Sequence, residues 1–560
     1  MQYFALRFLV FGIVIVLTPI FFILAAVSSN VWWVFAIITL ALSLVGIWDL
    51  IQPNHSVRRN YPVIGNLRFI FEAIRPEIRQ YFIESDEDNL PFSREERSIV
   101  YQRAKQQIDK RPFGTIENVY RDGYEWIGHS MVPSKIEDYD FRRRIGSKAC
   151  TQPYDCSIFN ISAMSFGALS ANAVLSLNKG AQLGGFAHDT GEGGISRYHI
   201  KHGGDLIWNI GSGYFGCRDA EGNFSPEEFA KRATMPQVKM IEIKLSQGAK
   251  PGHGGVLPGP KVTPEIAEAR GIQVGQECDS PNSHSAFSTP VGLLEFVQQL
   301  RQLSGGKPVG FKLCIGHVWE WFSIAKAMVK TGIVPDFITV DGAEGGTGAA
   351  PVEFCDHVGL PMKEALRLVH NTLKGIGLRD QVKIAAAGKI VTGFDVLKTL
   401  ALGADWCNSA RGFMFSLGCI QAQKCHTNTC PTGIATQDPM RQKALVVEDK
   451  SWRVKNFHHN TLLAFGELLA ATGLERPDQL QAHHVVSRVS SNEIKLWSAL
   501  YPEVEEGALL RGEYKLRIFE VAWPLATPDS FKPQNTTEAV EKKVNQAYND
   551  SSSEQDHDQD

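Results

Sequence analysis

The sequence predicts an α/β protein built on a (β/α)8 TIM-type barrel, preceded by an N-terminal transmembrane helical hairpin and a helical connecting region. Three observations support this prediction. Two long uncharged stretches open the chain, a mixed polar segment follows them, and beyond Cys150 short apolar runs alternate with longer helical patterns. Repeated strand-then-helix alternation over roughly three hundred residues favours parallel βαβ units closed into a barrel.

The first 51 residues predict a membrane hairpin. Phe8 to Val27 and Val31 to Trp48 contain no charged residue, and each stretch is long enough to approach or span a hydrocarbon core of about 30 Å. Only Ser28-Ser29-Asn30 separates them, so the chain would cross the membrane twice and return to its starting side. The alternative is a cleavable signal peptide with a cleavage region at Ala25 to Ser29.

The charges that flank the hairpin predict its orientation. Arg7 precedes the first stretch, and Arg58, Arg59 and Arg68 follow the second, so the positive-inside rule puts both ends in the cytoplasm. We therefore expect a two-span protein of the cell inner membrane, in contact with membrane lipid, with a cytoplasmic catalytic domain. The ten cysteines form no regular framework, which fits a reducing compartment.

Changes in amino-acid composition divide the rest of the chain into four predicted segments. A helical connecting region is expected over 52–149, with an Arg/Glu-rich helix near Pro91 to Lys110, and the barrel over 150–475. A C-terminal helical extension (476–530) and a disordered acidic tail (531–560) complete the prediction. The net charge of −3, without a basic patch carrying interleaved aromatic residues, argues against nucleic acid as a partner.

Six apolar runs are the predicted barrel strands. They are Ser157–Ala163, Lys239–Lys244, Val309–Cys314, Asp336–Val340, Lys383–Ala387 and Trp406–Ser409. Several end in clusters of Gly, Ser, Thr, Asp or Lys, and in a barrel the chemistry lies at the C-terminal ends of the strands. A doubly wound open sheet is the alternative, but no glycine-rich Rossmann fingerprint follows the early strands.

Glycine-rich loops follow several predicted strands. They are Asp189 to Gly194, Gly248 to Gly255, Asp341 to Gly348 and Ala387 to Lys389. Glycine lets the backbone approach a ligand closely, so four such loops at one rim suit a large planar cofactor that carries a phosphate. Gly388-Lys389 and Ser409 to Gly412 stand where flavin barrels usually hold that phosphate. Taken singly, each loop is explained equally well as an ordinary tight turn or as a cofactor-binding loop.

Three cysteines lie close together late in the chain, at Cys419, Cys425 and Cys430, with Pro431 after the last. Three thiolates can converge on a soft metal centre, and the odd number followed by Cys-Pro favours an iron–sulfur cluster. A zinc site that recruits His426 is one alternative, although its spacing differs from the usual C-x₂₋₄-C pair. Buried unligated thiols are another.

Five motifs together resemble the FMN-binding synthase domain of glutamate synthases, in that family's order. They are Ile161 to Ser170, Thr190 to Gly194, Ile243 to Gly252, Asp341 to Ala350 and Gly418 to Pro439. The resemblance covers roughly half the chain, from about Cys156 to about Pro439. It implies an FMN barrel with a 3Fe-4S cluster, in which 2-oxoglutarate and ammonia form 2-iminoglutarate and reduced flavin delivers a hydride to give L-glutamate.

The resemblance also implies roles for individual residues. Contacts to substrate or flavin would come from Lys244, Gln247, Lys250 and Arg270. FMN would be held by Ser162, Ala163, Ser165, Thr190, Lys312, Gly388, Lys389, Ser409, Arg411 and Gly412. The iron–sulfur ligands would be Cys419, Cys425 and Cys430. Arginine offers a bidentate fork and lysine a point charge to a dicarboxylate, and a solvated surface cation is the alternative for each lysine.

The sequence departs from the family pattern at several points, so the resemblance does not specify the substrate, the nitrogen donor or the electron donor. The chain opens on apolar sequence where complete glutamate synthases have a glutaminase domain, so ammonia or another amine donor is expected from outside. His253 and Asn209 replace a glutamate and a glutamine common in the large subunits. Electrons would come from ferredoxin or a reductase subunit, because no nicotinamide fingerprint is present. Alternatives are an N-methylglutamate synthase-like enzyme or a non-catalytic membrane electron-transfer or scaffold subunit.

Overall fold

The structure is a computed structural model that describes residues 6–84 and 91–534. The chain forms two compact units, Met1–Asp88 and Asn89–Asp560, each described here by itself. Most of the predicted acidic tail, from residue 535 onward, lies outside the described residues.

Two apolar helices, as predicted, form the N-terminal part of the first unit. After a short 3-10 turn, η1 (Leu6–Phe8), α1 (Leu9–Val27) and α2 (Trp32–Ile51) pack against each other. The Thr18 and Ser43 hydroxyls share a hydrogen bond of 3.0 Å between the helices, and the rings of Phe21 and Trp32 stack at 5.6 Å. Both helices are long and apolar enough to cross a membrane.

Short helices continue the first unit from the end of α2. They are α3 (Ser56–Asn60), α4 (Gly65–Ile78) and the π-helical turn η2 (Arg79–Ile83). Asp49, buried near the end of α2, accepts hydrogen bonds from the Val63 backbone N–H at 3.0 Å and from the Asn66 side chain at 2.5 Å. These two bonds fix the start of α4 against the end of α2.

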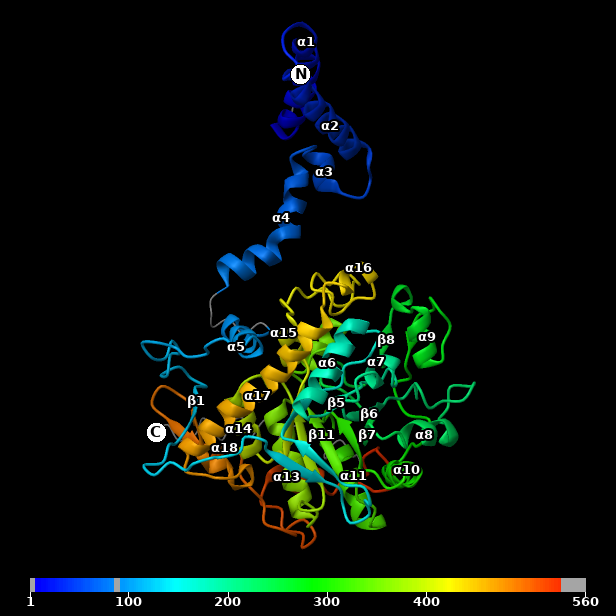
Figure 1. Ribbon diagram of the computed structural model, residues 1–560, viewed down its shortest axis with the longest axis vertical. Helices are drawn as coiled ribbons and strands as arrows, with labels where there is room; N and C mark the ends of the chain where they lie inside the picture. Colours follow the sequence, from blue (N-terminus) through cyan, green and yellow to red (C-terminus); the bar gives the residue numbers. More distant parts are fainter. Residues whose placement is uncertain (1–5, 85–90, 535–560) are drawn as a thin grey trace. The chain divides into compact units, whose positions relative to one another are not determined.

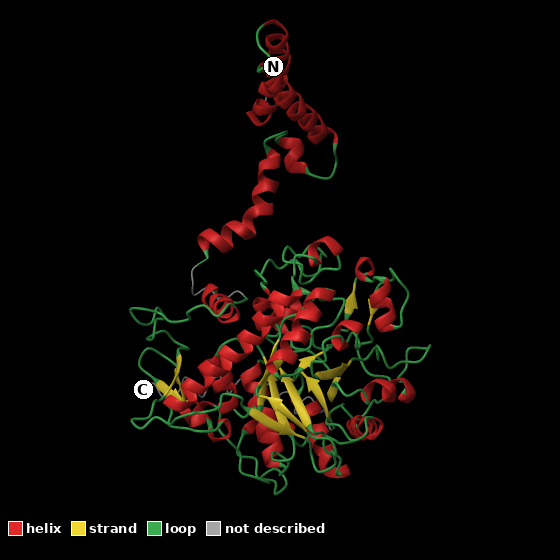
Figure 2. Cartoon of the chain, in the orientation of Figure 1, coloured by secondary structure: helices red, strands yellow, loops and turns green. Residues whose placement is uncertain are grey.

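A closed barrel of eight parallel strands is the centre of the second unit, which confirms the predicted fold class. The strands are β4 (Phe159–Ile161), β5 (His188–Asp189), β6 (Leu206–Ile210), β7 (Val238–Lys244), β10 (Val309–Leu313), β11 (Phe337–Asp341), β12 (Lys383–Ala387) and β13 (Trp406–Ser409). β13 pairs with β4 to close the ring. Figure 2 shows these strands in yellow with helices packed around them.

Helices follow the strands and cover the outside of the barrel (Figure 1). They are α6 (Ala171–Gly184), α7 (Arg197–Ile200), α8 (Pro226–Ala233), α10 (Pro290–Leu303), α11 (Val318–Thr331), α13 (Met362–Gly375), α14 (Gly393–Ala401), α15 (Arg411–Leu417) and α17 (Val447–Ala471). α6 and α17 approach closely at Gly180, where an added Cβ would lie 2.5 Å from Val454. Because both faces of most strands are buried, their sequences read as apolar runs.

Each of the six predicted runs overlaps a barrel strand, and the runs at Lys383–Ala387 and Trp406–Ser409 have the bounds of β12 and β13. The other two barrel strands were not among the predicted runs. β5 has only two residues, and both are polar. β6 carries Asn209 within its apolar run. These two strands are recognised by their pairing, since His188 of β5 lies between Ile161 of β4 and Leu206 of β6.

The remaining helices and strands precede the barrel, lie in its loops or follow it. Before it stand α5 (Arg94–Ala104), β1 (Glu125–Ile127), β2 (Arg142–Ile145) and β3 (Tyr154–Ser157). Its loops carry β8 (Val256–Leu257), η3 (Gly259–Lys261), α9 (Pro264–Arg270), β9 (Cys278–Asp279), α12 (Val352–His357) and α16 (Pro439–Gln442). After it come η4 (Pro477–Gln479), η5 (Ala482–His484), β14 (Val485–Arg488), β15 (Ile494–Leu496), α18 (Trp497–Leu500) and α19 (Arg517–Ala522). β14 pairs with both β1 and β15, which joins segments far apart in sequence.

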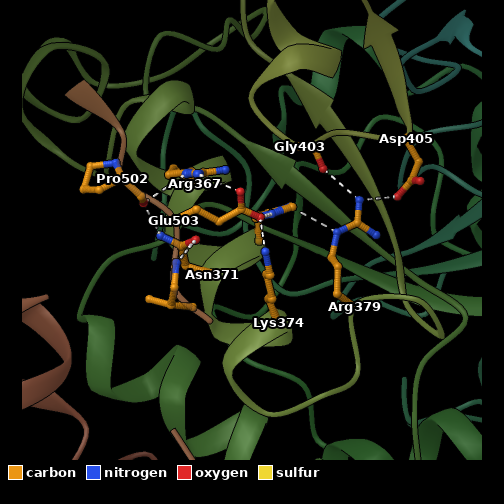
Figure 3. Close-up of polar contacts among 10 residues, drawn as sticks. Arg367, Asn371, Lys374, Arg379, Gly403, Asp405, Pro502 and Glu503 are labelled. Carbon is orange, nitrogen blue, oxygen red and sulfur yellow. Dashed lines mark hydrogen bonds and ion pairs between the residues drawn. The ribbon is translucent and has the colours of Figure 1, made fainter. Parts of the chain in front are cut away.

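The Glu503 carboxylate connects the C-terminal segment to the barrel through ion pairs and a hydrogen bond (Figure 3). Glu503 lies 2.6 Å from Lys374 Nζ and 3.6 Å from Arg367 Nη2. Arg379 Nε donates to His370 Nδ1 at 3.1 Å, so the His370 proton is on Nε2, which donates to Glu503 at 3.0 Å. Hydrogen bonds from His370 and Lys374 hold the pKa of Glu503 well below its ordinary value, although burial opposes this.

We expect Glu503→Gln to lower the free energy of unfolding by about 1–2 kcal/mol, because two cations lose a partly exposed anionic partner. Since the folded pKa of Glu503 is depressed, this contribution is complete above a pH of about 5 and disappears as the pH falls. Urea unfolding at several pH values measures it. Glu493→Gln, which removes an exposed pair with Lys495, is the matched control. A difference between wild type and Glu503→Gln that grew in acid would contradict the assignment.

Candidate active site

All eight barrel strands contribute to one cavity at their C-terminal ends. Its volume is about 400 Å³, within the roughly 300–1,000 Å³ that is usual for small-molecule sites. The lining includes one residue from the end of each strand or the loop after it: Ser162, Glu192, Asn209, Lys244, Lys312, Asp341, Ala387 and Ser409. Because strands end together at one face of a parallel barrel, residues distant in sequence meet there.

A buried polar network forms the floor of the cavity. Asn209 and Glu242 are paired in register on β6 and β7, and the Asn209 amide donates to Glu242 Oε1 at 2.6 Å. Thr339 donates to the other oxygen of Glu242 at 2.5 Å. Lys312 lies 3.3 Å from Asp341 Oδ2. These side chains point inward because Glu242 and Lys312 occupy inward positions of their strands, where successive side chains alternate in direction.

The network keeps a positive charge on Lys312. Burial alone would lower the pKa of Lys312, but Asp341, Glu242 and Asp189 together raise it above its ordinary value. Burial and the nearby Glu242 raise the pKa of Asp189, while Lys312 opposes them. A fixed ammonium group therefore lies at the cavity floor, beside the carboxyl groups of Asp341, Glu242 and Asp189.

A second group of charges forms one wall of the cavity. Glu192 Oε2 lies 2.9 Å from Lys244 Nζ, and Lys250 and Arg270 lie near enough to act on the same carboxylate. Burial would raise the pKa of Glu192, but Lys244, Arg270 and Lys250 bring it below its ordinary value. Burial lowers the pKa of Lys250. Among the side chains that line this wall, three cations face one carboxylate, so the lining has an excess of two positive charges, and Asp279 acts on Lys250 from outside the lining.

Arg270 is the least satisfied of these cations. It is 5% exposed, and its guanidinium makes only long contacts, 3.5 Å to the Phe166 carbonyl and 3.7 Å to Cys278 Sγ. Its Nε is buried without a hydrogen-bond partner, and its Cζ lies 4.9 Å from the ring centroid of Phe215. Among the described residues no ion pair is recorded for Arg270. A buried guanidinium with unused donors suits an anionic ligand.

Two more cations lie where the sequence predicts a phosphate. Lys389 and Arg411 follow β12 and β13 and face the Phe92 ring, with Arg411 Cζ 4.7 Å from its centroid. Burial and the neighbouring Arg411 lower the pKa of Lys389. No ion pair is recorded for either cation in the described part of the chain. Lys389 has a positive φ of 50°, which a non-glycine residue adopts only at some cost. The pair fits a phosphate group.

The three cysteines of the late motif line the same cavity as free thiols. The Gln421 backbone N–H lies 3.5 Å from Cys419 Sγ, and the Thr432 hydroxyl lies 3.4 Å from Cys430 Sγ. Burial raises the pKa of Cys430, but Thr432 and the backbone N–H groups of residues 432, 434 and 435 outweigh it and lower that pKa. Hydrogen bonds to sulfur are typical of iron–sulfur sites, so these thiols fit a cluster.

A single metal ion fits less well. Within residues 6–84 and 91–534, no group of three or more His, Cys, Asp or Glu side chains is placed to hold one ion. The zinc site considered from the sequence therefore has no ligand set in this part of the chain. An iron–sulfur cluster requires a different ligand geometry. Each thiolate binds its own iron, so the cysteine sulfur atoms need not converge on one point.

The cavity brings together nearly all the residues to which the sequence assigns a role. Thr190 is the exception: it is fully buried behind Gly191, and its hydroxyl accepts from the Asn209 backbone N–H at 3.1 Å. His253 is absent from the lining and contacts the Phe354 ring. The predicted residues that line the cavity are Ser162, Ala163, Ser165, Lys244, Gln247, Lys250, Arg270, Lys312, Gly388, Lys389, Ser409, Arg411, Gly412, Cys419, Cys425 and Cys430.

Among the lining residues to which the sequence assigned no role, three bear directly on the site. Glu192 lies inside the motif Thr190 to Gly194, and its charge beside three glycines was an available signal. Lys261 donates to the Cys425 carbonyl at 2.7 Å and so supports the cysteine loop. Phe92 precedes the barrel by more than sixty residues in sequence, and no local pattern connects it with the cavity.

Comparisons with known proteins identify the family of the chain. Residues 139–475 match the family described as a conserved region in glutamate synthase. The glutamate synthase large subunit-like protein YerD of Bacillus subtilis is 41% identical over 84% of this chain and 97% of that protein. Archaeal glutamate synthase (NADPH) of Methanocaldococcus jannaschii is 37% identical over 64% and 67% of the two chains. A mandelate oxidase crystal structure matches with 14% identity and a TM-score of 0.39, over 66% of this chain and 87% of that one.

Proposed function

The chain belongs to the glutamate synthase family of oxidoreductases, and from that premise we propose that it aminates 2-oxoglutarate reductively to L-glutamate. The charge of the cavity wall is the observation that carries this proposal. Among the residues that line this wall, Lys244, Lys250 and Arg270 face the carboxylate of Glu192, and their excess of two positive charges matches a dicarboxylate dianion.

Each cation of the wall has a distinct role in binding. Arg270 offers a planar fork with unused donors, which suits one carboxylate of the substrate. Lys250 is buried, with no ion pair recorded for it among the described residues, and it suits the other carboxylate. Glu192 holds Lys244 Nζ at 2.9 Å, which positions that ammonium group. Gln247 adds an amide donor at the same wall.

The other side of the cavity is proposed to hold FMN. Lys389 and Arg411 would bind its phosphate, and Ser162, Ala163 and Ser409 would border it with backbone and hydroxyl groups. When bound, FMN supplies the hydride that reduces an imino acid to an amino acid. Lys312 is fixed at the cavity floor by Asp341 and would stabilise negative charge next to it. The net reaction consumes 2-oxoglutarate, ammonia, two electrons and two protons, and yields glutamate and water.

Cys419, Cys425 and Cys430 are proposed to ligate a 3Fe-4S cluster at the rim of the cavity. Such a cluster would pass electrons singly from an external donor, ferredoxin or a reductase subunit, to the reacting centre. Lys261 and the Gln421 backbone N–H hold the cysteine loop in place. The nitrogen donor is proposed to be free ammonia, with methylamine as the donor to test for an N-methylglutamate synthase-like activity.

The two apolar helices α1 and α2 are proposed to anchor the protein in a membrane. Their length and composition permit two spans, and arginines lie on both flanks, with Arg7 donating to Asn60 at 3.2 Å. The positive-inside rule then leaves the barrel in the cytoplasm.

The reoxidation of chemically reduced protein tests the proposed function. We expect purified protein to be yellow and to release FMN, identified by chromatography. Reduced anaerobically, it should be reoxidised by 2-oxoglutarate with ammonia, and L-glutamate should form in equal amount to the flavin reoxidised. Pyruvate with ammonia is the control, because a monocarboxylate leaves one cation of the wall unpaired. If no keto acid reoxidises the flavin with any amine, the protein is an electron-transfer or scaffold subunit.

A further inference from the structure

One exposed stripe of apolar side chains runs along α4. Leu67, Ile70, Phe71, Ile74 and Ile78 recur at helical spacing and so lie on one face. All five are exposed, and Phe71 is 60% exposed. Three more exposed apolar side chains follow in η2, at Tyr81, Phe82 and Ile83. Contiguous apolar surface of this kind marks an interaction site.

The opposite face of α4 makes the helix's contacts within its own unit. Phe69 packs against the His55 ring at 5.3 Å and under the Arg58 guanidinium at 4.3 Å. Asn66, on the same side of the helix, bonds to Asp49 at the end of α2. The stripe is therefore not an inward-facing surface, and α4 starts directly beside the end of an apolar helix.

Basic residues border the stripe. Arg68, Arg75 and Arg79 recur at intervals of seven and four residues, so they form a row along one edge of it. Between Gln52 and Ile83 the chain has five arginines and two glutamates, and no lysine or aspartate. An apolar face edged by arginines suits a surface that is apolar inside and anionic outside, because long basic side chains reach from the apolar boundary to the headgroups.

We propose that α4 and η2 lie flat on the membrane, with the apolar stripe among the acyl chains and the arginine row against anionic headgroups. The proposed occupant is an anionic lipid surface. Continuity with the apolar helix α2 and the excess of arginine favour lipid over a second copy of the chain. The proposal goes beyond the proposed function, and lipid contact by α4 does not require α1 and α2 to span the membrane.

Hydrogen exchange followed by mass spectrometry tests this in the full-length protein. Nanodiscs of phosphatidylcholine alone are compared with nanodiscs of phosphatidylcholine and phosphatidylglycerol in equal parts. A helix of this length is marginal in water by itself, so slow exchange of amides 65–83 reports docking. We expect strong protection with phosphatidylglycerol, and each arginine removed should lower that protection about fivefold.

Two variants separate lipid docking from helix stability. Ile70→Gln/Phe71→Gln/Ile74→Gln removes the stripe while keeping good helix formers, and it should abolish the protection. Ala73→Gln, at an exposed position outside the stripe, is the matched control and should retain it. Arg68→Gln/Arg75→Gln/Arg79→Gln should remove only the additional protection from phosphatidylglycerol. Equal exchange in the stripe variant and the control would overturn the proposal.

Other outcomes are equally decisive. Protection that follows protein concentration and not lipid composition would assign the stripe to a second copy of the chain and overturn the lipid proposal. If the protein fractionates without lipid, the membrane anchor of the proposed function fails. The same amides are then followed after addition of vesicles of the two compositions. Protection by the anionic vesicles would still support the proposal, and its absence would overturn it.

Discussion

Arg270→Ala is expected to abolish most keto-acid-dependent reoxidation while leaving FMN and iron in place. Removal of one partner of a buried charge pair costs about 3–5 kcal/mol, which is roughly a hundredfold or more in binding. Arg270 is buried, lines the cavity and has unused donors, whereas the proposed phosphate site is formed by Lys389 and Arg411. The apparent KM for 2-oxoglutarate should therefore rise sharply while the flavin content stays unchanged.

Arg218→Ala is the matched control for this experiment. Arg218 faces the same Phe215 ring, with its Cζ 5.3 Å from the centroid, and donates to the Gly271 carbonyl at 2.8 Å. It does not line the cavity, so its loss should change reoxidation by no more than about twofold. Should Arg270→Ala and Arg218→Ala behave alike with every keto acid, the substrate does not bind at this wall.

Cys425→Ser is expected to remove most of the iron and to stop reduction of the flavin by an external protein donor. A serine alkoxide is a hard ligand and a poor replacement for a thiolate. Iron analysis and electron paramagnetic resonance measure the cluster. Chemical reduction of the flavin should be unaffected, because Cys425 lies in the cysteine loop and not among the residues proposed to hold FMN.

Cys355→Ser provides the comparison, because Cys355 is exposed and lies outside the cavity. This variant should keep its full iron content and its rate of reduction by the donor. Full iron content in Cys425→Ser as well would exclude the three cysteines as a ligand set and leave them as unligated thiols at the rim of the cavity.

Much of the barrel could be predicted because its strands are buried on both faces. A strand such as β12 must be apolar along its length, so Lys383–Ala387 is visible as a run. β5 could not be found in this way. His188 and Asp189 form a strand only because β4 and β6 flank them, and hydrogen bonds between distant strands leave no local pattern.

Prediction from the sequence has a similar limit for the lysines of the site. Motif resemblance identified Lys244, Lys250 and Lys312 as candidates, but it could not tell a buried cation from a solvated one. The structure places Lys312 among three carboxyl groups, pairs Lys244 with Glu192, and leaves Lys250 buried beside them. Charge balance in a cavity depends on which groups meet there, and that depends on the closure of the barrel.

The sequence by itself determined the strand-and-helix alternation, the two apolar helices, the family and a set of site residues nearly all of which line the cavity, because periodicity, apolar length and ordered motifs are local properties. Only the tertiary structure decided that Phe92 lies beside Lys389 and Arg411, that Glu503 forms an ion pair with Lys374 of α13, and that Arg270 is buried with unused donors. Each of these contacts joins residues far apart in sequence. Their energies depend on burial and mutual distance, which the chain acquires only when the barrel closes.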